Sequence, residues 1–285
     1  MNEFPYYETN PAQSSAPRFR FSGLPGDRPI VNIVLFFLTI ISTYLTGGWS
    51  YCLPIISILL AHEMGHYWMC RRYGIKATLP FFIPLPFVSP FGTLGAVIQM
   101  RGVMPNRRAL FDIGAAGPIA GLILTVPFTL WGLAHSQVIL SQQVQDSNFF
   151  LGESLLFKLF SWMIFGKLPE GSDIILHPMA YAGWVGLLVT ALNLIPIGQL
   201  DGGHIFYSMF GARSRGANLA FIGTMGALTV IYPGWALWFL ILLFFGRRHP
   251  SPFDDYTPLD NKRRLLGWII FTIFIVSFTP IPFKF

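Results

Sequence analysis

Long apolar runs separated by short polar connections dominate the chain from residue 30 onward. A helix that crosses a bilayer needs about 20 mostly apolar residues, and several of these runs approach that length. We predict helices at residues 30–45, 51–70, 109–134, 178–195, 217–231, 235–245 and 265–281. The pattern therefore predicts an α-helical multi-pass membrane protein. We expect six or seven transmembrane helices; the range reflects the shortest runs, which carry the weakest signal.

Residues 76–101 interrupt the helical pattern. Four prolines lie between residues 80 and 90, and they exclude a continuous helix. Residues 92–98 are rich in glycine and β-branched side chains, which predicts a strand or a hairpin. Extended backbone at membrane depth must be covered by protein or line a cavity. We therefore expect a membrane-associated β element near the end of the second helix; a surface loop folded over that helix end is the alternative.

The remaining segments divide the chain into four parts. We predict a cytoplasmic tail at 1–29, a core at 30–246, a basic cytoplasmic linker at 247–264, and a C-terminal transmembrane helix at 265–285. Inside the core, the apolar stretch 155–165 is too short to span and is expected to lie along the membrane surface. The linker, which includes Asp254 and Asp255, is expected to be solvated.

Composition and charge agree with a membrane protein. Hydrophobic residues make up 53% of the chain and charged residues 11%, whereas soluble domains carry about 25% charged residues. The net charge of +6 does not indicate nucleic acid, because the cations form short clusters between apolar runs. With seven alternating spans, all but three of the 19 Lys and Arg fall on one side; the exceptions are Lys158, Lys167 and Lys284. That side, with the N-terminus, is predicted to be cytoplasmic.

The string His62-Glu63-Met64-Gly65-His66 closes the second apolar run. On a helix, positions i and i+4 share one face, so both imidazoles can bind one metal ion. Glu63 is then placed to act as the general base for a metal-activated water. Ionisable side chains are costly in hydrocarbon, which favours a functional role over two packed or capping histidines.

A catalytic zinc usually has three protein ligands, so a third one is needed. The candidates in apolar surroundings are Asp112, His177, Asp201 and His204. Asp201 follows a helix break at Pro196, and the predicted topology places it on the same side of the membrane as His62. Both features favour Asp201 as the third ligand. Asp201 and Asp112 could instead cap helices, and His204 could be a packed imidazole. His177 is expected on the far side of the membrane.

Two motifs together resemble the site-2 protease family of intramembrane zinc metalloproteases. The first is H-E-x-x-H at residues 62–66, and the second is N-x-x-P-x-x-x-x-D-G at residues 193–202. Residues 116–118, Ala-Gly-Pro, are also similar to the family, and residues 89–95 resemble a subgroup with plastid and bacterial members. The resemblance extends over residues 30–246, and no PDZ or CBS domain is expected.

The resemblance implies a site and a reaction. His62, His66 and Asp201 are expected to bind Zn²⁺. Glu63 is expected to be the general base, and Asn193 to hydrogen-bond the substrate backbone or the developing oxyanion. The substrate is expected to be a transmembrane segment of another protein, unwound and held extended by the strand at 92–98.

The family resemblance also leaves alternatives. We expect a bacterial inner membrane, with the active site toward the cytoplasm; a plastid membrane is the alternative. A proteolytically inactive metal-binding scaffold is the second candidate function, although the presence of Glu63 disfavours it. A transporter with a midplane metal site would predict two halves with matching broken helices, which the sequence lacks.

Overall fold

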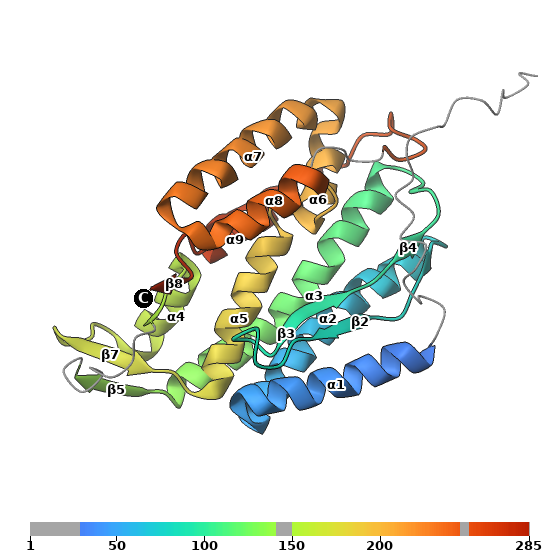
Figure 1. The fold of residues 1–285 in the computed structure, drawn as a ribbon. Coiled ribbons are helices and arrows are strands. Elements are labelled where there is room, and N and C mark those ends of the chain that lie inside the picture. Colours follow the sequence, from blue (N-terminus) through green and yellow to red (C-terminus); the bar gives the residue numbers. More distant parts are fainter. Residues whose placement is uncertain (1–28, 141–149, 246–250, 285) are drawn as a thin grey trace, which may run out of the picture.

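The computed structural model describes residues 29–140, 150–245 and 251–284, and it is mainly helical (Figure 1). The α-helices are α1 (Pro29–Gly47), α2 (Trp49–Arg72), α3 (Arg107–Ala134), α4 (Leu155–Phe165), α5 (Pro178–Asn193), α6 (Asp201–Phe210), α7 (Ser214–Ile231), α8 (Ala236–Phe245) and α9 (Asn261–Ser277). The strands are β1 (Lys76–Ala77), β2 (Phe81–Pro84), β3 (Thr93–Val97), β4 (Met100–Arg101), β5 (Gln137–Leu140), β6 (Phe150–Leu151), β7 (Ser172–Ile175) and β8 (Phe283–Lys284).

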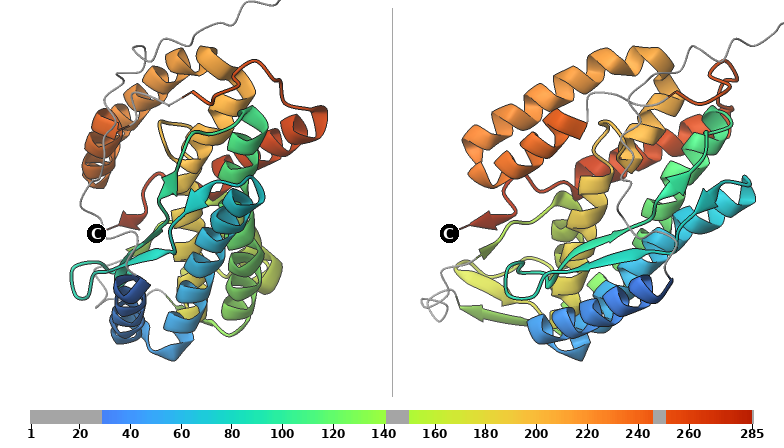
Figure 2. Two further views of the ribbon diagram at one scale, coloured as in Figure 1. Left: turned by 90° about the vertical axis from the view of Figure 1, so that its right-hand side faces the viewer. Right: turned by 45° about the vertical axis from the view of Figure 1, so that its right-hand side comes forward.

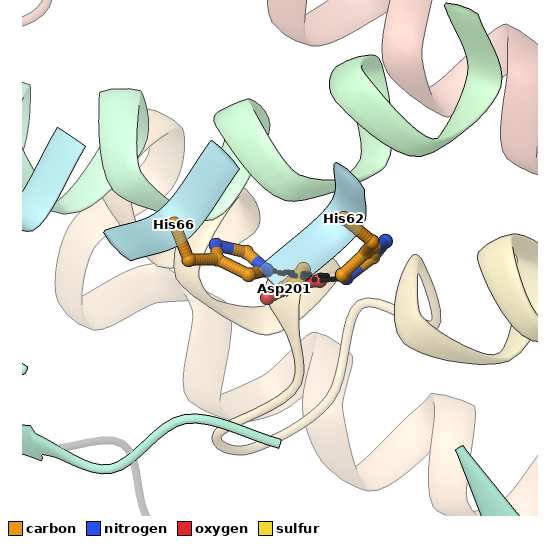
Figure 3. Close-up of side chains that lie close together, drawn as sticks. All are labelled: His62, His66 and Asp201. Carbon is orange, nitrogen blue, oxygen red and sulfur yellow. Dashed lines mark hydrogen bonds and ion pairs between the residues drawn. The ribbon is translucent and has the colours of Figure 1, made fainter. Parts of the chain in front are cut away.

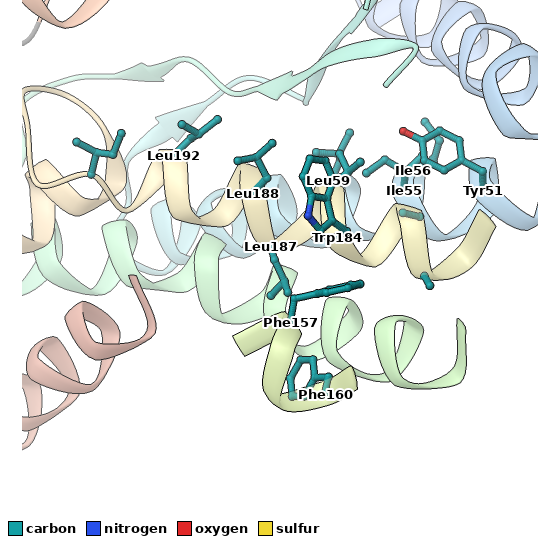
Figure 4. Packing of buried hydrophobic residues seen from close by; sticks show 14 of the residues in the cluster. Tyr51, Ile55, Ile56, Leu59, Phe157, Phe160, Trp184, Leu187, Leu188 and Leu192 are labelled. Atoms are coloured by element: carbon teal, nitrogen blue, oxygen red, sulfur yellow. The ribbon is translucent and has the colours of Figure 1, made fainter. Parts of the chain in front are cut away.

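The centre of the molecule is a bundle of α2, α3 and α5. α3 packs against both of the others and against α6. Most side chains of α5 are buried, and Trp184, Leu187 and Leu188 form the core with Ile55 and Leu59 of α2 (Figure 4). The end of α5 and the end of α2 are therefore held side by side, and this arrangement positions the candidate site.

α1 has an inverted pattern of burial. Its buried side chains are polar, namely Asn32, Thr39, Ser42 and Thr43, while most of its large apolar side chains are exposed. The hydroxyl of Thr43 donates to the carbonyl of Thr39 at 2.8 Å, which satisfies that group inside the helix. A helix with polar atoms inward and apolar atoms outward is stable where its outer face meets lipid.

The hairpin of β2 and β3 lies between α1 and the bundle (Figure 1). The side-chain amide of Asn32 donates to the carbonyl of Leu79 at 2.9 Å, and the hydroxyl of Ser42 donates to the carbonyl of Gly92. The polar face of α1 thus fixes both ends of the hairpin. This confirms the predicted strand at 92–98 and its position beside the second helix.

The C-terminal third covers the other side of the bundle. α7 and α8 pack against each other, and α9 packs against α4, α5 and α6 (Figure 2). After α9 the chain returns to the bundle, where β8 pairs with β6. Gly152 directly follows β6, and its carbonyl accepts from the indole of Trp184 at 2.7 Å. By pairing with β6, the C-terminal strand β8 is therefore held at the core of α5.

Length and composition support part of the predicted membrane topology. Among the described residues, α1 and α3 are long and apolar enough to cross a bilayer, whereas α4, α7 and α8 are shorter apolar helices. Six or seven crossings therefore stay a prediction. The apolar stretch 155–165 forms α4. Nearly all of the predicted tail, residue 246 of the core and residues 247–250 of the linker lie outside the described residues.

The described part of the predicted linker, from residue 251, is exposed at several positions and is also tied to the helices. The carboxylate of Asp255 accepts from Nε of Arg107 at 2.8 Å and from the hydroxyl of Tyr207 at 3.0 Å. The backbone of Asp254 donates to the carbonyl of Pro105 at 2.9 Å. This segment therefore joins the start of α3 to α6, and α9 begins at Asn261, before the predicted span.

Candidate metal centre

The last turns of α2 carry the histidine pair. His62, Glu63 and His66 are 4%, 6% and 6% exposed, and they lie on a helix that continues to Arg72. The i and i+4 spacing places both imidazoles on one face of α2, as the sequence predicted, and this face lies against α3. The two ring centroids are 4.9 Å apart.

A compact loop brings Asp201 to the histidines. α5 ends at Asn193, and the chain turns through residues 194–200 before α6 starts at Asp201. A Cβ atom at Gly202 or Gly203 would collide with carbonyl oxygens of that loop, so glycine permits the close return. Leu200 is the N-cap of α6, and no side chain caps this helix. Asp201 therefore does not cap α6, and its carboxylate faces the histidines.

The three side chains converge on one point (Figure 3). Oδ2 of Asp201 lies 3.1 Å from Nε2 of His62 and 3.2 Å from Nε2 of His66, and the two Nε2 atoms are 3.1 Å apart. In a tetrahedral zinc site with bonds of about 2.0–2.1 Å, neighbouring ligand atoms are roughly 3.3 Å apart. Two imidazoles and a carboxylate at these separations match zinc in both donor chemistry and spacing.

The second nitrogen of His66 fixes the orientation of its ring. Nδ1 of His66 lies 2.8 Å from the carbonyl oxygen of Ile113 in α3. A carbonyl can only accept, so Nδ1 carries the proton and the lone pair of Nε2 faces the cluster. This pairing of a ligand histidine with a backbone carbonyl is typical of metal sites.

Glycines of α3 make room for both histidines. A Cβ atom at Gly117 would overlap the ring of His66, and one at Gly121 would lie 3.3 Å from Nδ1 of His62. Glycines at this spacing allow close packing between membrane helices. The structure shows that they also form the wall behind the histidines. Their spacing on one helical face was the available signal, but the sequence does not show which helix they meet.

Two further polar groups border the cluster. The backbone N–H of Ile98, directly after β3, lies beside the carboxylate of Glu63. Nδ2 of Asn193 lies 3.3 Å from Nε2 of His62. The described residues thus bring together all five side chains that the two motifs predicted: His62, Glu63, His66, Asn193 and Asp201.

The other candidate ligands lie outside the cluster. Asp112 does not cap α3, because that helix begins at Arg107 and Asn106 is its cap. Asp112 instead accepts hydrogen bonds from Arg263 and Tyr73. His177 caps α5, since its Nδ1 accepts from the backbone N–H of Met179 at 3.2 Å. His204 is buried against Gly114 of α3, as expected for a packed imidazole.

Two histidines and a carboxylate, buried together among packed apolar helices, are typical of a metalloprotein. Comparison with known proteins shows the family to which the chain belongs. Residues 50–233 match the model of Peptidase family M50. The chain belongs to this family, which confirms the resemblance seen in the motifs.

Plant proteins are among its relatives. The chain is 32% identical over 234 residues to "Probable zinc metalloprotease EGY2, chloroplastic" of Arabidopsis thaliana. The aligned region covers 80% of this chain and 41% of that protein. It is 31% identical over 263 residues to the protein of the same name from Oryza sativa subsp. indica, covering 89% and 47%. It is 32% identical over 233 residues to "Probable zinc metalloprotease EGY1, chloroplastic" of Oryza sativa subsp. japonica, covering 80% and 39%. The chain thus spans less than half the length of these curated relatives.

Proposed function

We propose that this chain is a zinc-dependent endopeptidase that cuts peptide bonds within or beside transmembrane segments of other membrane proteins. The observation that carries the proposal is the convergence of His62, His66 and Asp201 at zinc-ligand spacing, directly beside the buried carboxylate of Glu63. Membership of Peptidase family M50 supports a peptidase, and the names of the relatives support zinc.

The proposed ligands are His62, His66 and Asp201, which leave one tetrahedral position open. When bound there, zinc supplies acidity to water and polarises a carbonyl. Glu63 takes the proton from the attacking water and later returns it to the leaving amine. Asn193 donates through Nδ2 to the oxygen of the scissile carbonyl, where negative charge develops.

The hairpin provides a place for an extended substrate. A transmembrane helix hides its peptide bonds, so it must unwind before they can be attacked. β3 pairs with β2 along one edge and leads directly to Glu63 through Ile98. A peptide that adds to β3 as a further strand would therefore pass the general base in an extended form.

The membrane environment is proposed on two grounds. The exposed apolar face of α1 and the length of α1 and α3 support a bilayer. The names of the relatives support the plastid membrane, whereas the bacterial inner membrane and the cytoplasmic orientation rest on the sequence pattern alone. A proteolytically inactive metal-binding scaffold is the competing function.

Substitution of Glu63→Gln separates the two functions. The purified protein is reconstituted with a single-span model substrate in proteoliposomes, and both cleavage and zinc content are measured. We expect the variant to keep its zinc and to lose cleavage by a factor of roughly 100 or more, the usual effect of removing a general base. Glu153→Gln, at an exposed position outside the site, is the matched control. Equal cleavage by both variants would contradict the mechanism, and zinc without cleavage in the parent would favour the scaffold.

A further inference from the structure

An apolar cavity of about 220 Å³ lies beside the metal centre. Leu188 and Val189 of α5 form one wall, and Gly95 of β3 lies on the hairpin side. Trp238 of α8 and Phe283 of β8 contribute the outer wall. Of the described residues that line the cavity, none carries a charged side chain. An unpaired charge placed here would lose its hydration without compensation, so the cavity suits an apolar group.

The cavity adjoins the proposed reaction site. Asn193 lines it, and the same side chain lies 3.3 Å from Nε2 of His62. Gly95 also lines it, and three residues later the backbone N–H of Ile98 lies beside Glu63. A strand rises about 3.3 Å per residue, so roughly 10 Å of β3 separates the two points. A peptide side chain that enters the cavity from β3 therefore lies within about three residues of the bond that is cut.

The outer wall belongs to a part of the chain beyond the family match, which ends at residue 233. The indole of Trp235 donates to the carbonyl of Pro280 at 2.7 Å. The ring of Phe283 lies 5.9 Å from Phe91, in a stacked arrangement. Packing thus fixes the wall to the hairpin and to α5. Residues outside the matched region thus close one side of the cavity, while most of its lining lies within the match.

We infer that this cavity selects substrates with a large apolar side chain, of leucine or phenylalanine size, within three residues of the scissile bond. The inference rests on the proposed peptidase function and names its substrate class. The volume accommodates one side chain and not a helix, which agrees with a substrate that is unwound where it is cut.

Peptidyl hydroxamates test the inference on the purified, zinc-loaded protein. The series carries a methyl, isobutyl or benzyl side chain at each of the first three positions beside the hydroxamate, and dissociation constants are measured by calorimetry. We expect the isobutyl and benzyl compounds to bind at least about tenfold more tightly than the methyl compound at one position, as is usual when a pocket is filled by several methylenes.

Two variants locate the preference in the cavity. Val189→Phe should fill the space and remove the preference, while affinity for the methyl compound stays unchanged and reports an intact metal centre. Val230→Phe makes the same change on an exposed face of α7, where Val230 is 86% exposed, and should keep the preference. If Val189→Phe does not fold, Trp238→Ala removes part of the wall and should weaken binding of the benzyl compound.

The outcomes separate this inference from the function on which it rests. Equal binding of all compounds, or an unchanged preference in Val189→Phe and Trp238→Ala, would overturn the inference and leave the peptidase proposal intact. Binding of none of the compounds would overturn it too. Loss of a co-purifying acyl chain from Val189→Phe, without a change in preference, would show a lipid site instead. If the parent protein shows a size preference but cleaves no substrate, the inferred selectivity of the cavity would be supported and the proposed peptidase function contradicted.

Discussion

Arg263 donates two hydrogen bonds to Asp112 across 151 residues of sequence, from Nε to Oδ1 at 2.7 Å and from Nη2 to Oδ2 at 2.6 Å. The hydroxyl of Tyr73, just after α2, donates to the same carboxylate at 2.5 Å. Ile113, the residue after Asp112, accepts the hydrogen bond from His66 through its backbone carbonyl. One carboxylate thus ties α9 and the end of α2 to the turn of α3 that orients a proposed zinc ligand.

Loss of this pair should destabilise the fold. We expect Arg263→Ala to lower the free energy of unfolding by about 1–3 kcal/mol, because it removes two hydrogen bonds to a half-buried carboxylate. Arg263→Lys should recover only part of the loss, since an ammonium group cannot make the two-pronged contact. Unfolding in mixed micelles measures the change. Arg264→Ala, at an exposed position of the same helix, is the control, and an equal loss there would contradict the role of the pair.

The start of α9 should respond to acid. The backbone N–H of Arg263 and then its side chain lower the pKa of Asp260 from 3.8 to about 2. A carboxylate with a lowered pKa stabilises the folded state above pH 3.8, and this contribution is lost as pH falls from 3.8 toward 2. Asp260→Asn should retain the cap but lose that pH dependence. Thermal unfolding of both proteins between pH 6 and pH 2 measures the difference, and parallel curves would show that Asp260 is not responsible.

The glycine wall behind the histidines should be sensitive to a single methyl group. Gly117→Ala would place Cβ inside the ring of His66, so that imidazole must move away from Asp201. We expect zinc affinity, measured by competition with a chelator, to fall by roughly 10–100-fold. Gly216→Ala provides the matched control in α7, where a Cβ meets open space. An unchanged affinity in Gly117→Ala would mean that α3 does not constrain the site.

The zinc content should depend on all three proposed ligands. Asp201→Asn keeps the size of the side chain and removes its charge, and we expect elemental analysis to show loss of most of the bound zinc. His177→Asn preserves a good helix cap at α5, distant from the cluster, and should keep full zinc content. Chelation should also lower the melting temperature of the parent and leave that of Asp201→Asn nearly unchanged, since bound metal stabilises only a protein that binds it. Full zinc content in Asp201→Asn would exclude it as a ligand.

The motif residues of the site could be predicted from sequence because their chemistry is local. The spacing of His62 and His66 fixes a common helical face, and a carboxylate after a helix break is a recognisable partner. The strand beside them was predicted for a similar reason, since prolines exclude a continuous helix and β-branched residues favour extended backbone whatever the surrounding fold.

Contacts between distant segments could not be predicted. Asp112 was expected to cap a helix or to join the site, and Asp255 to be solvated, but each is paired with an arginine from another segment. Such pairs depend on how helices pack in three dimensions, and a single sequence records no information on which charges meet. The role of Gly117 was missed for the same reason, because its neighbour comes from a different helix.

The ligands of the proposed metal centre are separated by 139 residues between His62 and Asp201. At about 5–20 residues per second, a ribosome needs roughly 7–28 s to complete that interval. Until the interval is complete, the chain holds the histidines without the carboxylate that completes the set. A newly made chain therefore has no complete set of proposed ligands until Asp201, at the start of α6, has been synthesised.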